Sequence, residues 1–127
     1  MATADQIVQV AEYEVTGDPD AYLEAIAAVA ARVEAEGVST MTRYTFYLDR
    51  DAGTVTSVIV HESAESWVNH HRMLEQWAAE YGRLKETFHQ TRLRIFGPVT
   101  DDIRAWLGEH GAAFEEAGLL SGGFERP

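Results

Sequence analysis

The chain has 127 residues, a length that fits one domain and can bury a core without disulfides or structural metals. It contains no cysteine, which excludes thiol catalysis, disulfide frameworks and cysteine-ligated zinc or iron–sulfur sites. Its formal net charge of -11 repels phosphate backbones and anionic lipids, so neither nucleic acid nor a membrane surface is expected as a partner.

No segment reads as a targeting signal or as a membrane anchor. Residues 1–6 lack the basic residues and the apolar run of a secretory signal. The longest apolar stretch, residues 25–33, is far too short to span a bilayer. A cytoplasmic location is therefore expected.

The first part of the chain predicts a strand followed by a helix. Residues alternate between two faces from Ile7 to Val15, which is the period of a β-strand. Asp18 is then suited to cap a helix whose first residue is Pro19. Apolar residues recur there at three- and four-residue steps, and Gly37 is placed to end the helix.

A β-hairpin and a second long helix are predicted next. Threonine and aromatic residues favour a strand over residues 38–49, and the loop 49–53 returns the chain as a strand over residues 54–62. Ser63 is placed to cap a helix, with Gly82 as the expected point of an early break. The apolar stripe of this helix consists of Trp67, His70, Leu74, Trp77, Tyr81 and Leu84, with Phe88 as its furthest member.

The remaining residues predict one more strand, a short helix and a tail. Residues 88–96 alternate as a strand, which Gly97 and Pro98 end. Thr100 is placed to cap a short helix that runs through Leu107. The glycines and the tail that follow predict little regular structure.

This order of elements predicts an α+β fold of the ferredoxin-like type. The pattern βαββαβ gives a four-stranded antiparallel sheet with both helices on one face. Residues 7–97 form the core of this single domain, and residues 98–127 form a C-terminal extension. The second strand carries large apolar groups on both faces, such as Tyr44 and Tyr47. We therefore expect a homodimer whose two sheets close into a dimeric α/β barrel.

The element order and one stretch of sequence resemble a known family. The stretch HESAESWVNH, residues 61–70, places an acidic residue, an aromatic residue and a histidine between a strand end and the second helix. Over residues 7–97 the chain is similar to the antibiotic biosynthesis monooxygenase group of dimeric α/β-barrel proteins. The resemblance implies oxidation of a polyphenolic or quinol substrate by dioxygen without a cofactor, although other members degrade haem and many have no assigned activity.

The haem-degrading branch of the superfamily differs from this chain at its functional positions. That branch has an asparagine on the first strand, a tryptophan at the end of the third strand and a histidine late in the second helix. Here the first strand has no asparagine, His61 stands where the tryptophan would fall, and the late helical position is near Glu80. Haem degradation is therefore not expected.

His70 is the candidate catalytic residue. Helical spacing places it in the apolar stripe between Trp67 and Leu74, with its ring aimed at the sheet. Burial would lower the pKa of the ring, and the neutral imidazole could take a proton from an acidic phenol or an activated carbon. The alternative is a half-buried core histidine that one hydrogen bond satisfies.

Four neighbours are candidate substrate contacts. Trp67 and Trp77 would offer flat walls to an aromatic substrate. His61 and Tyr44 would position or stabilise its oxygens, although His61 would instead point into the dimer barrel if its strand face looks away from the helices. All such large side chains are also ordinary core residues at this spacing. A metal site is not expected, because no set of spaced ligands is present.

Three arginines on the predicted strands have two interpretations. Arg43, Arg92 and Arg94 would pair with Glu12 and Glu14 across the sheet, or would steady an oxyanion or carboxylate of a ligand. The sequence alone does not decide between them.

Three functions remain open at this stage. The first is a cofactor-independent monooxygenase that acts on an aromatic, phenolic or quinol-like small molecule with dioxygen. The second is a non-catalytic dimer whose pocket binds a hydrophobic metabolite or is filled by side chains. The third is isomerase or decarboxylase chemistry on the same scaffold. A cavity for a ring system beside His70 favours the first over the second.

Overall fold

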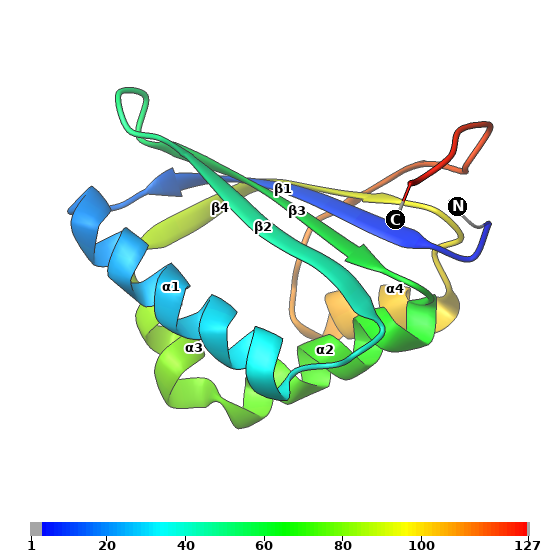
Figure 1. Cartoon of the computed structure of the whole chain (residues 1–127), viewed down its shortest axis with the longest axis horizontal. Helices are drawn as coiled ribbons and strands as arrows, with labels where there is room; N and C mark the ends of the chain where they lie inside the picture. The colour runs from blue at the N-terminus through cyan, green and yellow to red at the C-terminus, as the bar shows by residue number, and fades with distance from the viewer. Residues whose placement is uncertain (1–3, 127) are drawn as a thin grey trace.

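The computed structural model describes residues 4–126 of the chain. Its elements are β1 (Ile7–Val15), α1 (Pro19–Glu36), β2 (Met41–Asp49), β3 (Thr54–His61), α2 (Ala64–Gln76), α3 (Ala78–Lys85), β4 (Phe88–Phe96), α4 (Asp101–Glu109) and β5 (Glu115–Gly118). Figure 1 shows the sheet as one layer, with the helices together on one side of it. The predicted α+β class is confirmed. None of these helices is long and apolar enough to cross a membrane.

The sheet has five strands in the order β2-β3-β1-β4-β5. β1 pairs antiparallel with β3 and β4, and β2 pairs antiparallel with β3, as the ferredoxin-like prediction requires. The prediction of a four-stranded antiparallel sheet is wrong in one respect, because β5 joins the edge and runs parallel to β4. β5 has the sequence EEAG and is exposed throughout, so it carries no apolar alternation that could indicate a strand.

Ion pairs hold β5 at this edge. Arg92 of β4 donates from Nε to Glu115 at 2.7 Å, and Arg104 of α4 donates from Nη2 to Glu116 at 2.7 Å. Long-range charge pairs of this kind leave no periodic pattern in the sequence. The local sequence therefore could not predict β5.

The predicted second helix is two helices, and it divides at Trp77 rather than at Gly82. Trp77 leaves the helical conformation, with φ -100° and ψ 41°. Its ring lies under the guanidinium of Arg32 in α1, 4.3 Å from the ring centroid, and Arg32 also donates to Glu80 at 2.7 Å. These contacts dock α3 against α1. Gly82 lies within α3, because nothing tertiary requires a break there.

The core lies between the sheet and the helices. Its sheet side comes from alternate residues of the central strands, such as Ile7 and Ala11 in β1 and Val55 in β3, as the period-two pattern predicted. The extension also contributes to it, because Ile103 and Leu107 of α4 are 0% and 4% exposed. Helix α4 therefore packs as part of the core.

The opposite face of the sheet has no helix over it (Figure 1). The arginines lie on this face, alternating with the strand residues that point toward the helices. Arg92 pairs with Glu115 and, at 3.9 Å, with Glu12. Arg43 donates to the Tyr47 hydroxyl at 2.6 Å. The arginines therefore make contacts within the sheet and are absent from the ligand-sized cavity described below.

Candidate functional site

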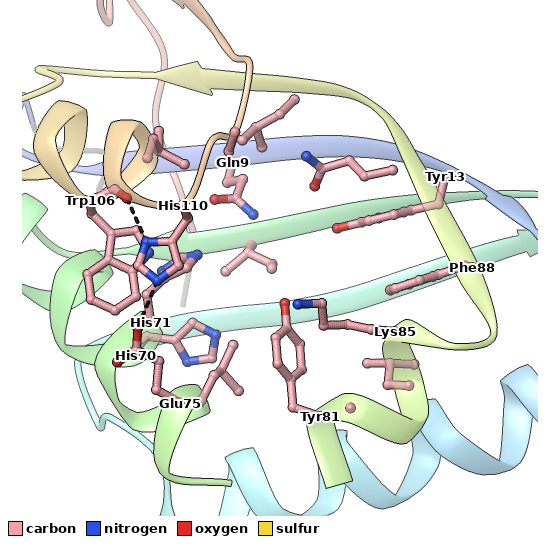
Figure 2. Close-up of a pocket in the computed structure, with 18 of the residues that line it drawn as sticks. Gln9, Tyr13, His70, His71, Glu75, Tyr81, Lys85, Phe88, Trp106 and His110 are labelled. Atoms are coloured by element: carbon pink, nitrogen blue, oxygen red, sulfur yellow. Dashed lines mark hydrogen bonds and ion pairs between the residues drawn. The ribbon is translucent and has the colours of Figure 1, made fainter. Parts of the chain in front are cut away.

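A cavity of about 700 Å³ lies between the inner face of the sheet and helices α2, α3 and α4 (Figure 2). This volume is within the range of small-molecule pockets. Aromatic residues form much of its wall: Tyr13, Tyr44, Phe46, Tyr81, Phe88 and Trp106. The rings of Tyr13 and Phe88 stack at 4.2 Å with only 4° between their planes, so one wall is flat. The interior beside His70 is thus hollow.

His70 projects from α2 into this cavity (Figure 2). The helix begins next to the end of β3, and the Ser63 hydroxyl caps it by accepting from the Ser66 amide at 3.2 Å. The ring is 2% exposed, and Tyr44 meets it edge-on at 5.6 Å. Within residues 4–126, its enclosed Nδ1 atom has no hydrogen-bond partner.

The buried position keeps the His70 ring neutral. Removal from water, and to a smaller extent the nearby rings of His71 and His61, lower its pKa from 6.5 to about 3. At neutral pH the ring can therefore accept a proton, but only if a new partner stabilises the resulting charge. A negative charge on a ligand beside the ring is such a partner, because an opposite charge raises the pKa of an imidazole.

Of the four predicted contacts, Tyr44 lines the cavity and His61 stands behind it. Tyr44 packs edge-on against both His70 and Phe46. His61 is fully buried on the helix-facing side of β3, and its Nδ1 atom lies 2.8 Å from the Ser66 hydroxyl in a hydrogen bond. Its ring centroid is 5.6 Å from that of His70. Burial lowers its pKa to about 3 as well.

The two predicted tryptophans lie outside the cavity wall. Trp67 is fully buried, and its Nε1 atom donates to Gln9 Oε1 at 2.8 Å, which fixes a side chain that does line the cavity. Trp77 lies against Arg32 between α1 and the later helices. Their helical spacing marks them as inward-facing, but it cannot distinguish a core position from a cavity wall.

Sequence reasoning missed His71, which also lines the cavity. Helical geometry turns it about 100° from His70, so the two side chains leave the helix in different directions. The cavity extends around α2 toward α4, however, and both rings reach it. His71 stacks on Trp67 at 3.8 Å and donates from Nδ1 to the Trp67 carbonyl at 2.9 Å. Burial lowers its pKa to about 4.

The α4 side of the cavity ends in a charged pair. His110 donates from Nδ1 to the Trp106 carbonyl at 2.7 Å and from Nε2 to Glu75 at 2.8 Å (Figure 2). Both acceptors are oxygen atoms, so the two bonds together favour the imidazolium form of His110, in which each ring nitrogen carries a proton. The bond to Trp106 and the Glu75 carboxylate both raise its pKa. This pair joins α4 to α2 at the cavity.

Among residues 4–126, no three histidine, aspartate or glutamate side chains are grouped so that they could hold a metal ion. Only His110, of the histidines in the wall, has a carboxylate bonded to it. The functional groups that the wall offers to a ligand are imidazoles, phenols, amides, the amine of Lys85 and the carboxylate of Glu75.

Comparison with known proteins assigns the fold. Neither a protein-family model nor a curated protein sequence matches the chain. Among solved structures, MupZ from Pseudomonas fluorescens is similar over 97% of this chain and 96% of its own, with a TM-score of 0.67 and 20% identity. SnoaB, a cofactor-independent oxygenase from Streptomyces nogalater, is similar over 76% of this chain and 95% of its own, with a TM-score of 0.61 and 17% identity.

A third solved structure has the same fold. A candidate antibiotic biosynthesis monooxygenase from Caulobacter crescentus is similar over 76% of this chain and 92% of its own, with a TM-score of 0.62 and 16% identity. The chain has the fold of the antibiotic biosynthesis monooxygenase-like proteins. This confirms, at the level of the fold, the resemblance drawn from the element order and the stretch HESAESWVNH.

Proposed function

We propose that the protein is a cofactor-independent monooxygenase that oxidises an aromatic, phenolic or quinol-like small molecule with dioxygen. The observation that carries this proposal is a hollow, aromatic-walled cavity of about 700 Å³ with a buried neutral histidine projecting into it. The monooxygenase-like fold supports it, since SnoaB, which shares that fold, is a cofactor-independent oxygenase.

The cavity suits a planar, electron-rich ligand. The stacked rings of Tyr13 and Phe88 provide a flat surface, and Tyr44, which also lines the cavity, meets His70 edge-on at 5.6 Å. Aromatic groups stack on such walls with favourable geometry. A ligand that fills the cavity would also displace water and so protect a reactive intermediate from it.

His70 would act as the proton acceptor. It takes a proton from the substrate, and the anion and the imidazolium then stabilise each other in a site of low dielectric. The anion reduces dioxygen and forms a carbon–oxygen bond to it, which gives a peroxide at the ring carbon. The proton returns from His70 to the peroxide and gives a hydroperoxide. Loss of the hydrogen on the same ring carbon, with cleavage of the O–O bond, then releases one oxygen atom as water and leaves the other as the carbonyl oxygen of a quinone product.

Replacing His70 tests this role. We expect His70→Gln to lower kcat for oxygen consumption by about 100-fold or more with polycyclic phenols and hydroquinones, because glutamine keeps polarity but cannot accept the proton. The exposed neighbour Asn69 provides the matched control, and Asn69→Gln should retain the wild-type rate. An oxygen electrode measures both.

The same assay distinguishes the other functions. Equal oxygen consumption by His70→Gln and by the wild type would show that His70 has no catalytic role. Tight binding of every accepted phenol without any turnover would favour the binding protein. Conversion of substrate without oxygen consumption would favour isomerase or decarboxylase chemistry.

We also propose that the protein is a homodimer in which two copies join through the uncovered face of the sheet. Tyr47 is 54% exposed on this face, and Val10 and Val58 are only half-buried there. Within residues 4–126, the buried Nε atom of Arg94 has no acceptor. Because Glu12 and the arginines share the face, a second copy can oppose unlike charges.

Light scattering coupled to size-exclusion chromatography measures this assembly. We expect twice the mass of one chain for the wild type and the mass of one chain for Val58→Glu, because a charge at the centre of the face would be buried without a partner. A wild-type protein of single-chain mass at micromolar concentration would contradict the proposal.

A further inference from the structure

We propose that the cavity recognises a carboxylate on its aromatic ligand, and that Lys85 and Tyr81 hold this carboxylate on the α3 side while the ring lies toward His70. This inference deepens the proposed function, since it concerns the same cavity. It names an acidic aromatic compound as the class of ligand.

Lys85 occupies an unusual place in the chain. It is the only lysine in the sequence, and it is the last residue of α3. Its side chain lines the cavity, with Nζ 5.5 Å from the centroid of the Tyr81 ring. Figure 2 shows the amino group and the Tyr81 hydroxyl extending into the same part of the cavity.

Lys85 differs from the other charged side chains in the wall, because it has no partner of opposite charge among residues 4–126. Glu75 is the wall's one carboxylate, and His110 is bonded to it. Lys85 forms no salt bridge with any residue in the described part of the chain, although the protein carries a net charge of -11. An ammonium group with no local counterion is a ready partner for a ligand carboxylate.

Tyr81 supplies a second donor at the same place. Among residues 4–126 no hydrogen bond occupies its hydroxyl, and burial raises its pKa, which keeps the proton on the oxygen. A protonated phenol can donate a hydrogen bond to a carboxylate, whereas an apolar group has no acceptor for that bond. Ammonium and hydroxyl together therefore favour an oxyanion with two acceptor atoms.

The arrangement also orients the ligand. Lys85 and Tyr81 stand on α3, whereas His70 stands on α2, and all three reach the same cavity (Figure 2). A carboxylate fixed at α3 leaves the ring beside the aromatic wall and presents its phenolic edge to the imidazole. The anion would also be kept away from Glu75, on the α4 side.

A matched pair of ligands tests the proposal by calorimetry. The compounds 6-hydroxy-2-naphthoate and 2-naphthol share a ring system and a phenol, and they differ in the carboxylate, which lies at the end of the rings opposite to the phenol. We expect the wild type to bind the naphthoate about tenfold or more tightly than the naphthol. Lys85→Met should remove this preference and leave the affinity for 2-naphthol unchanged, while Lys85→Arg should keep most of the preference. Lys85 is exposed, so these variants should fold.

The sole lysine offers a second readout. Acetylation by an amine-reactive ester, followed by peptide mapping, should be slowed at Lys85 by 6-hydroxy-2-naphthoate and not by 2-naphthol. The proposal is overturned if the wild type shows no preference for the naphthoate, including the case in which neither compound binds, or if Lys85→Met weakens both compounds equally. Oxygen consumption with neutral phenols would then still support the proposed function, so the two failures are distinguishable.

Discussion

Lowering the pH from about 7 to about 5 is expected to remove about 6 kcal/mol from the free energy of unfolding, about 4 kcal/mol of it through His61 and His70 at about 2 kcal/mol each. Both rings are buried and neutral in the folded protein, with pKa values lowered from 6.5 to about 3. The unfolded chain takes up protons as the pH falls below 6.5, whereas the folded chain does not. Stability is therefore complete above pH 6.5 and declines through the interval down to about 3.

The other titrating groups do not reverse this trend. His71 is shifted in the same direction, to a pKa of about 4, and accounts for the remaining loss of about 2 kcal/mol. His110 is shifted upward, so its contribution is present at low pH and is lost as the pH rises, but its exposed ring is screened by solvent. The pKa values of Glu115 and Glu116 lie below 4.5, so their contributions are lost only at lower pH.

Urea unfolding followed by tryptophan fluorescence at both pH values measures the effect. His70→Gln should reduce the difference between the two pH values by about 2 kcal/mol, because glutamine does not titrate. The exposed His89→Gln serves as the control and should leave the difference unchanged. Equal stability of the wild type at pH 7 and pH 5 would show that the two rings are not buried as neutral groups.

The order of elements and the inward direction of His70 could be predicted, because both follow from local periodicity. The alternation of residues between two faces predicted β1. The recurrence of apolar residues at three- and four-residue steps placed His70 on the inner side of its helix. Thr100 was recognised as the cap of α4, and its hydroxyl accepts from the Ile103 amide at 3.4 Å.

The features that escaped prediction depend on contacts between distant parts of the chain. The break at Trp77 follows from its packing on Arg32, and β5 depends on its ion pairs with β4 and α4. Lys85 was not singled out, because a charged residue at the end of an amphipathic helix is usually solvated. Only the arrangement of α3 against the sheet brings Lys85 to the cavity.

Replacing both Ile103 and Leu107 of α4 by alanine is expected to lower the free energy of unfolding by about 5 kcal/mol or more, since each truncation of a buried aliphatic residue costs about 2 to 5 kcal/mol. Their exposures are 0% and 4%. Leu107 also lines the cavity, so the same variant should weaken ligand binding under conditions in which it remains folded.

A control on the outer side of α4 separates packing from helix content. Ala105→Gln combined with Glu109→Gln changes two exposed residues of the same helix and should leave stability within about 0.5 kcal/mol of the wild type. The alignments with SnoaB and the Caulobacter protein leave about a quarter of this chain unmatched, whereas that with MupZ covers 97% of it.

If α4 were only an appendage, the double variant of its buried residues and the double variant of its exposed residues would have the same stability. A large difference between them would mean that α4 and the cavity it closes belong to one cooperative unit.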